Sequence, residues 1–167
     1  KEYPIQNVMT LAPNIALFIT PAGSGIRSMA DLKGKRVVVG PAGAGFEHFV
    51  EPILKAHGIS YEDIQPLNDT QAGAVALLAD GSAHAAFLGG AVPTASITQA
   101  CASQDILFIP FEEAAKQELV ANYPFFSPKT IPANTYTGQS DAFQGLNVGN
   151  MILVTSSSVS QDTVYDF

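Results

Sequence analysis

Two glycine-rich loops carry the residues of this sequence that are best suited to binding a small molecule. The first loop lies between an expected strand and an expected helix, and its candidates are Gly43, Ala44, Gly45, Phe46 and Glu47. Glycines let the backbone approach a ligand closely, and the following helix begins with unpaired N–H groups and the positive end of its dipole. The loop therefore favours an anionic ligand such as a carboxylate or a phosphate.

A second loop again joins the end of an expected strand to the start of a helix. Its candidates are Gly89, Gly90, Ala91, Pro93 and Thr94. The hydroxyl of Thr94 either meets a ligand oxygen or helps to cap its own helix.

Two candidates of the first loop also have structural interpretations. Gly43 and Gly45 would serve packing alone if the loop were only a tight turn. Glu47 falls in the first turn of the helix, where its carboxylate would complement the dipole.

Other kinds of chemistry find little support. The spacing G-x-x-G-x-G of residues 40–45 matches neither the dinucleotide-binding fingerprint nor, without a following Lys-Ser or Lys-Thr, a Walker loop. His48, His57 and His84 form no metal-binding pattern, and His84 is expected to be structural. No G-x-S-x-G elbow is present, and Cys101, the only cysteine, is expected to be a buried inert thiol. We therefore expect a protein that is not an enzyme and has no catalytic residue, metal or cofactor.

Composition restricts the function further. The chain has 167 residues, of which 47% are hydrophobic and 14% are charged. This balance suits one folded domain, or one domain with parts of a second, and is the opposite of a disordered chain. The formal net charge of −7 argues against nucleic-acid binding but permits an anion held by backbone amides at one loop. No apolar stretch is long enough to span a bilayer.

The elements that must position the two loops alternate between strand and helix. Buried strands are predicted at residues 15–19, 36–39, 85–88 and 106–109, and a last strand at 148–155. Helices are predicted at residues 28–32, 46–54, 71–79, 93–100 and 111–123, with an irregular stretch at 124–145. Pro52 is expected to kink its helix or delay its start, Pro93 to occupy a first turn, and Lys116 to face solvent. Such alternation predicts an α/β fold with a mainly parallel sheet and helices on both faces.

Several motifs together resemble a known family. They are DLKGKRVVVG at residues 31–40, the glycine-rich turn at 40–45, Asp80-Gly81 followed by Ala85-Ala86-Phe87, Val92-Pro93-Thr94, YPFF at 123–126 and TIPANTY at 130–136. This set resembles the second lobe of type II periplasmic binding proteins and, more narrowly, the TAXI subfamily of TRAP-transporter solute receptors. The matches run from about Ala16 to Phe167.

The resemblance implies a fold, a task and a location. Such receptors have two α/β lobes joined by hinge strands, close on a small organic anion such as glutamate or a dicarboxylate in the periplasm, and deliver it to the permease subunits of a TRAP transporter. Residues 1–24 would be an N-terminal segment with one hinge strand, 25–145 the second lobe, and 146–167 the return hinge strand with a truncated helix. Tyr136 would belong to the ligand site, and the first lobe would be missing.

Both ends of the sequence predict a chain trimmed from a longer one. It opens at Lys1 without methionine and without a signal peptide, and residues 160–167 are expected to form a helix cut short in its second turn. The periplasmic location therefore comes from the resemblance.

Departures from the family pattern leave alternatives open. Ala44 and Phe46 stand where the family offers hydroxyl groups, and Phe46 would either contact an apolar part of the ligand or join the core. His84 and Ala91 also depart from the pattern. The ligand would then differ from glutamate-like acids, or the lobe would bind nothing. A free-standing interaction module is the alternative function, with the missing lobe's contact face exposed or covered by a second copy of the chain.

Overall fold

The computed structural model describes residues 4–165, so the predictions made for residues 1–3 and 166–167 lie outside the described part. The strands are β1 (Ile5–Pro21), β2 (Arg36–Val38), β3 (Gln65–Leu67), β4 (Ala85–Gly90), β5 (Ile106–Ile109), β6 (Ser127–Ile131) and β7 (Phe143–Ser156). The helices are α1 (Glu47–Ala56), α2 (Gln71–Ala79), α3 (Ala95–Ser103), α4 (Glu113–Asn122) and α5 (Gln161–Tyr165), with short 3-10 turns at Ala22–Ser24, Met29–Leu32 and Tyr61–Asp63. None of the described helices is long and apolar enough to cross a membrane.

The sheet has the strand order β3-β2-β4-β1-β7-β6, and β5 also pairs with β1. Strand β2 is parallel to β3 and β4, whereas β1 is antiparallel to β4, β5 and β7. Strands β2, β3, β4 and β5 therefore run in one direction, and β1 runs between β4 and β5 in the other. The predicted α/β class is confirmed. The sheet is mixed and not mainly parallel as predicted, because four of its six strand pairs are antiparallel. The antiparallel β1 in the middle of the sheet was not predicted, because an apolar run does not reveal the direction of its strand.

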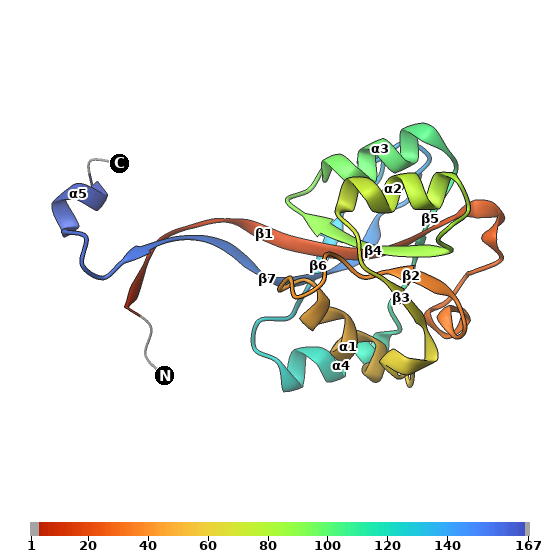
Figure 1. The fold of residues 1–167 in the computed structure, drawn as a ribbon, viewed down its shortest axis with the longest axis horizontal. Helices are drawn as coiled ribbons and strands as arrows, with labels where there is room; N and C mark the ends of the chain where they lie inside the picture. The colour runs from red at the N-terminus through yellow and green to blue at the C-terminus, as the bar shows by residue number, and fades with distance from the viewer. Residues whose placement is uncertain (1–3, 166–167) are drawn as a thin grey trace.

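Helices cover both faces of the sheet, as predicted. Helices α2 and α3 lie on one face, and α1 and α4 lie on the other (Figure 1). Phe18 and Phe87 point into the core beneath α1, and Leu17 and Leu88 point into the core beneath α2 and α3. Because β1 and β4 are buried on both faces at this level, their sequences are continuous apolar runs.

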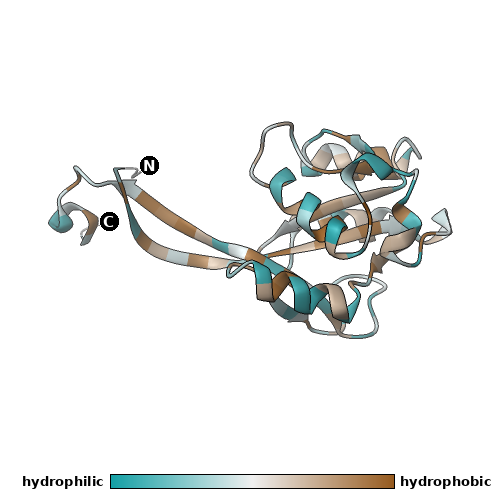
Figure 2. Ribbon diagram, turned by 90° about the horizontal axis from the view of Figure 1, so that it is seen from below, coloured by the Kyte–Doolittle hydropathy of each residue, from teal (hydrophilic) through white to brown (hydrophobic). Residues whose placement is uncertain are grey.

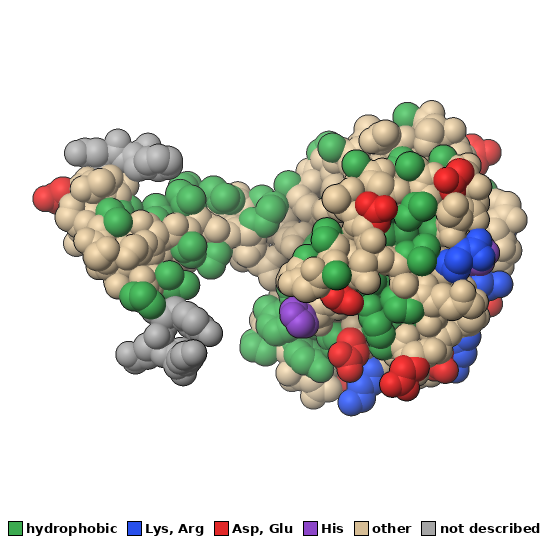
Figure 3. Space-filling model, in the orientation of Figure 1, with side chains coloured by type: hydrophobic (Ala, Val, Ile, Leu, Met, Phe, Trp, Pro, Cys, Tyr) green, Lys and Arg blue, Asp and Glu red, His purple; other side chains and the backbone are tan. Residues whose placement is uncertain are grey.

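Beyond the lobe, β1 and β7 continue as a two-stranded ribbon that ends at α5 (Figure 1). We call the ribbon made by Ile5–Ala12 and Met151–Ser156 the arm. Its sequence is hydrophobic along much of its length (Figure 2), and apolar side chains form several patches on its visible surface (Figure 3). The large apolar side chains exposed on the arm are Ile5, Met9, Leu11, Ile152 and Val154.

Local signals placed some helix ends correctly. The helix predicted at 71–79 has these bounds in the structure, and Thr70 is its N-cap, because its hydroxyl accepts a hydrogen bond from the N–H of Gly73 (3.0 Å). The turn predicted to begin at residue 28 does begin there, with a capping box formed by Ser28 and Asp31. Helix α1 begins at Glu47 and continues through Pro52, so a delayed start is wrong.

Three other predictions are wrong. Helix α3 begins at Ala95, so Pro93 precedes the helix instead of lying in its first turn. Lys116 is buried on α4 and pairs with Glu113 at 2.7 Å. The stretch 124–145 is not irregular throughout, because β6 and the start of β7 lie within it. Strand β6 is a mostly exposed edge strand that contains a proline, and such strands lack the apolar signal of buried ones.

Candidate functional site

Phe46 and Gly89 bring the two predicted loops into contact. The Phe46 ring lies 4.9 Å from that of Phe87, between centroids, and packs against the core. A Cβ atom at Gly89 would lie 2.6 Å from Cζ of Phe46 and 2.8 Å from the carbonyl oxygen of Ile15. Glycine is therefore required at position 89 by close packing. Phe46 joins the core, which is one of the two alternatives that the sequence left open for it.

Close packing does not explain the glycines of the first loop. A Cβ atom at Gly43 or Gly45 would meet no atom within 4 Å. Gly43 has φ of +72°, a left-handed conformation that favours glycine. Its role is thus to let the backbone turn before α1 begins.

Glu47 holds this loop in place. Its Oε2 accepts a hydrogen bond from the N–H of Gly43 (3.2 Å), and its Oε1 accepts one from the hydroxyl of Tyr61 (2.9 Å). Both hydrogen bonds lower the pKa of Glu47, and the bond from Tyr61 has the larger effect. Burial, followed by the hydrogen bond and charge of Glu47, raises the pKa of Tyr61 to about 12. The first turn of α1 therefore already has its own carboxylate, which would repel an anionic ligand.

The second loop offers a different setting. Thr94 is buried, and its hydroxyl donates to the carbonyl of Ala91 (3.1 Å), so it does not cap α3. The N–H of Thr94 donates to the hydroxyl of Tyr136 (2.9 Å), which brings the predicted Tyr136 to this loop. Helix α3 has no side-chain cap and no acidic residue in its first turn. Its positive end is therefore better suited to an anion than that of α1.

A hollow of about 370 Å³ lies between the first turns of α2 and α3, and its lining residues are Gln71, Ala72, Gly89, Thr94, Ala95, Ser96 and Gln99. Gln71 links its two sides. The side-chain amide of Gln71 donates to the carbonyl of Gly89 (2.9 Å), and its Oε1 accepts from the hydroxyl of Ser96 (2.8 Å).

Sequence reasoning missed Gln71, Ser96 and Gln99. The available signal was that each is a polar residue in the first or second turn of an alanine-rich helix.

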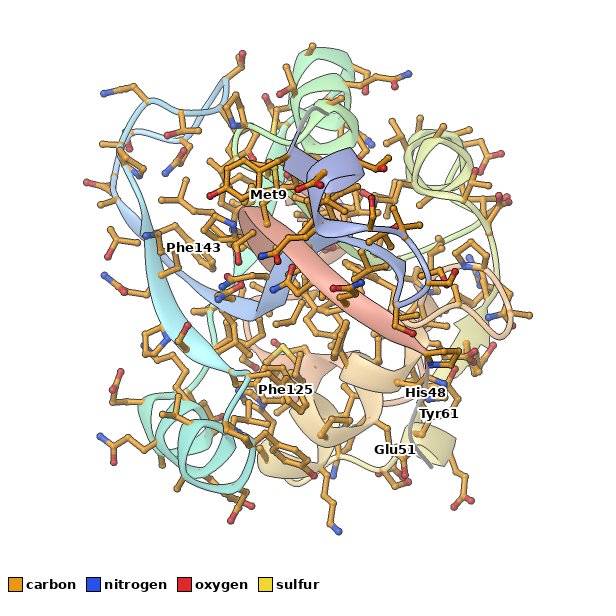
Figure 4. All side chains as sticks on the ribbon, turned by 90° about the vertical axis from the view of Figure 1, so that its left-hand side faces the viewer. Met9, His48, Glu51, Tyr61, Phe125 and Phe143 are labelled. Atoms are coloured by element: carbon orange, nitrogen blue, oxygen red, sulfur yellow. The ribbon has the colours of Figure 1, made fainter. Side chains whose placement is uncertain are left out.

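A second hollow, of about 410 Å³, lies on the other side of the loop, near the base of the arm. Its lining residues are Ala12, Pro13, Ile15, Ala91, Val92, Lys129, Thr130 and Pro132. Figure 4 looks onto this face of the lobe along the arm. It shows Met9 on the arm, Phe125 below it, and His48 of α1 near Tyr61.

The histidines and the cysteine are not gathered into a site. Nδ1 of His84 accepts a hydrogen bond from the N–H of Arg36 (3.0 Å), which confirms a structural role. His57 bridges the carbonyl of Ile53 and the N–H of Glu112. Cys101 is buried, and burial raises its pKa. Within residues 4–165, no three His, Cys, Asp or Glu residues are grouped closely enough to hold a metal ion.

Solved structures of binding proteins share this fold. The periplasmic aliphatic sulphonate binding protein SsuA from Escherichia coli matches with a TM-score of 0.55 and 18% identity over 86% of this chain and 41% of that one. The alkanesulfonate-binding protein SsuA from Xanthomonas axonopodis pv. citri, bound to MOPS, matches with a TM-score of 0.51 and 27% identity over 66% and 37%. An ABC transporter periplasmic binding protein from Brucella ovis, with glutathione bound, matches with a TM-score of 0.52 and 12% identity over 93% and 38%.

The chain spans well under half the length of each of these three proteins. What they share with it is a solute-binding-protein fold. The sequence model of the NMT1-like family matches residues 2–167, and the chain therefore belongs to the NMT1-like family.

Proposed function

We propose that this chain is a lobe of an extracytoplasmic solute receptor and binds a small organic anion, such as glutamate or a dicarboxylate, at the hollow between α2 and α3. In this proposal residues 25–145 form the lobe, and residues 1–24 and 146–167 connect it to the rest of the receptor. The observation that carries it is the meeting of two helix N-termini at a hollow in which Gln71 and Ser96 present polar groups. The first-turn amides of α3, which has no side-chain cap, suit a carboxylate, whereas Thr70 already caps α2.

The binding-protein fold supports a transport role over catalysis. The relatives from Escherichia coli and Xanthomonas are named for sulfonates, so a sulfonate belongs beside the carboxylates among the ligands to be tested. The motif resemblance supports a TRAP permease as the membrane partner. The Brucella protein is named as an ABC transporter component, which makes an ABC permease the alternative. An extracytoplasmic location follows from the same proposal.

Ligand-induced stabilisation tests the binding site. L-Glutamate, succinate and propane-1-sulfonate are each titrated into the 167-residue chain while its melting temperature and its amide NMR spectrum are recorded. At a hundred times its Kd, a ligand adds about 2.7 kcal/mol to the free energy of unfolding. We expect one of these anions to raise the melting temperature and to shift the amide signals of Gln71 and Ser96.

A pair of variants makes the result specific. Gln71→Met removes the amide from the hollow, whereas Gln117→Met changes an exposed position on α4. We expect only the first to weaken binding, by roughly fivefold to tenfold for one lost hydrogen bond. Equal affinity in both variants, or no anion that shifts Gln71 and Ser96, would refute binding at this hollow.

A second candidate function has one observation in its favour. The arm exposes apolar side chains along two strands, as expected of a module that associates with another copy of itself. The association state of the chain in solution distinguishes this candidate, as argued below.

A further inference from the structure

We propose that the hollow at the base of the arm is an anion subsite in which Lys129 binds a singly charged oxyanion attached to a short apolar body. This inference rests on the proposed solute-binding function and names the side chain that would recognise the ligand's charge. The expected ligand class is a carboxylate or a sulfonate with an alkyl chain.

Three segments that are distant in the sequence build this hollow. Strand β1 contributes Ala12, Pro13 and Ile15, the second loop contributes Ala91 and Val92, and β6 and the residue after it contribute Lys129, Thr130 and Pro132. Its volume of about 410 Å³ lies within the usual range for small-molecule sites. The hollow also shares a loop with the site proposed above, since Gly89 and Thr94 line the one and Ala91 and Val92 the other.

Lys129 is the only charged residue among those that line the hollow. The one ion pair within the described residues joins Lys116 to Glu113, so no described carboxylate lies within 4 Å of the Lys129 ammonium. An ammonium group with three donors suits an oxyanion.

The sheet fixes the backbone of Lys129 beside the hollow, and its side chain is exposed. Lys129 lies opposite Gly145 in the pairing of β6 with β7, and it shares a strand face with the buried Ile131. A Cβ atom at Gly145 would lie 3.0 Å from Cγ2 of Ile15. The missing side chain at position 145 thus lets Ile15 lie close to β7, next to the strand that carries Lys129.

The remaining walls are suited to an alkyl group. Ala12, Pro13, Ile15, Val92 and Pro132 present mainly carbon atoms to the hollow. A ligand with one charged end would place that end at the Lys129 ammonium and bury its alkyl chain against these residues. Small-molecule sites usually combine a few polar groups with apolar walls in this way.

The test uses butane-1-sulfonate as the charged probe and butan-1-ol as its neutral counterpart. Both are titrated into the ¹⁵N-labelled 167-residue chain and followed by amide NMR, which also reports whether each variant is folded. We expect butane-1-sulfonate to shift the signals of Ala91, Val92 and Thr130. Lys129→Gln should weaken its binding about tenfold, because a charge-assisted hydrogen bond is lost. Lys129→Arg should restore most of the affinity.

Matched controls isolate the charge of Lys129. Lys33→Gln removes one positive charge from an exposed turn elsewhere. It should change the sulfonate affinity less than roughly twofold, because salt screens a distant exposed charge. Binding of butan-1-ol should be equal in the wild type and in Lys129→Gln. An equal loss in Lys33→Gln and Lys129→Gln would overturn the assignment, because overall charge would then explain it.

The pattern of shifted signals separates this inference from the function on which it rests. Lys129-dependent shifts at Ala91 and Thr130 support the subsite, whether or not butane-1-sulfonate also shifts Gln71 and Ser96. Shifts confined to Gln71 and Ser96 retain the site between α2 and α3 and refute the subsite. No shifts up to about 50 mM, well beyond millimolar affinity, refute the subsite, while the titrations with L-glutamate, succinate and propane-1-sulfonate decide the site between α2 and α3.

Discussion

Glu47 shows how one side chain changes the interpretation of a glycine-rich loop. From the sequence, the loop before α1 is the stronger candidate for binding an anion. In the structure, both carboxylate oxygens of Glu47 accept hydrogen bonds, one from Gly43 and one from Tyr61. The carboxylate thus occupies the position that a ligand anion would take. The loop before α3 lacks such a residue, and Gln71 and Ser96 lie beside it.

The Tyr61 hydroxyl reports on this contact. Its pKa is raised to about 12, by burial first and then by Glu47. Glu47→Gln removes the charged acceptor, so we expect the Tyr61 pKa to fall toward its ordinary value of 10 while staying above it. The measurement is the ultraviolet absorbance of tyrosinate as a function of pH, with Tyr61→Phe subtracted to isolate this residue.

The sign of the accompanying stability change follows from linkage. The folded pKa exceeds that of the unfolded chain, so the contribution of Tyr61 is complete below about pH 10 and is lost as the pH rises through about 12. Tyr61→Phe should lack this loss. An identical Tyr61 titration in the wild type and in Glu47→Gln would show that the contact is absent in solution.

Among the candidate site residues, the glycines were the easiest to identify from the sequence. Gly43, Gly89 and Gly90 stand out because glycine is a distinctive residue type at a strand end. Lys129 and Gln71 did not stand out, since lysine and glutamine are ordinary on any surface. Their proposed roles depend on the strand order, which places β6 near the second loop and α2 beside α3. That order cannot be predicted from the residue pattern of a single sequence.

At the scale of the elements, the buried parts of the sheet were predictable and the edge was not. The apolar runs of β2 and β4 follow from burial of their side chains within the layers, and β5 is buried at Ile109 and partly buried at its other residues. Strand β6 is mostly exposed, carries Pro128 and has only Ile131 buried, so its residue pattern resembles a loop. Helix ends were predictable where a side chain made the cap, as Thr70 does, and uncertain where the backbone alone ended the helix.

The contact between the end of β4 and the start of α1 gives a sharp test of the packing. Gly89→Ala would force a Cβ atom to within 2.6 Å of the Phe46 ring and 2.8 Å of a backbone oxygen. We expect a loss of roughly 1–3 kcal/mol in the free energy of unfolding, the usual cost of overpacking. The measurement is the midpoint of urea denaturation.

Gly23→Ala is the matched control for this substitution. Gly23 has no atom within 4 Å of its Cβ position, and its φ is not in the left-handed region. The control should change stability by no more than about 0.5 kcal/mol. If Gly89→Ala proved as stable as Gly23→Ala, the two loops would not pack together as described.

At the scale of the whole molecule, the arm is the feature least like an isolated globular domain. Its strands pair only with each other, and its apolar side chains are exposed on a two-stranded ribbon. A ribbon of two strands is marginal on its own in water, and its free edges can pair with other strands. Under the proposed function the rest of a longer receptor would cover the arm, and under the alternative a second copy of the chain would do so.

We expect the 167-residue chain to self-associate through the arm as its concentration rises. Met9 and Ile152 are 52% and 49% exposed, so Met9→Thr with Ile152→Thr should reduce association without lowering the melting temperature of the lobe. Sedimentation equilibrium of the wild type and the double variant measures this. Val120→Thr, at another exposed apolar position on α4, is the control and should associate like the wild type. A wild-type chain that remains monomeric would reject the interaction-module candidate.

The pairing of β1 with β7 has a consequence for the shape of the arm. Val8 and Leu11 are skipped in that pairing, so β1 carries two extra residues in a stretch where β7 carries none. A strand with more residues than its partner follows the longer path, and bulges bend the strand that contains them. Strand β1 accordingly traces the outer arc of the ribbon in Figure 1. Deleting one of these unpaired residues would remove its bulge and leave the pairing on either side unchanged, so the bend of the arm is set by the number of residues that β1 has beyond those of β7.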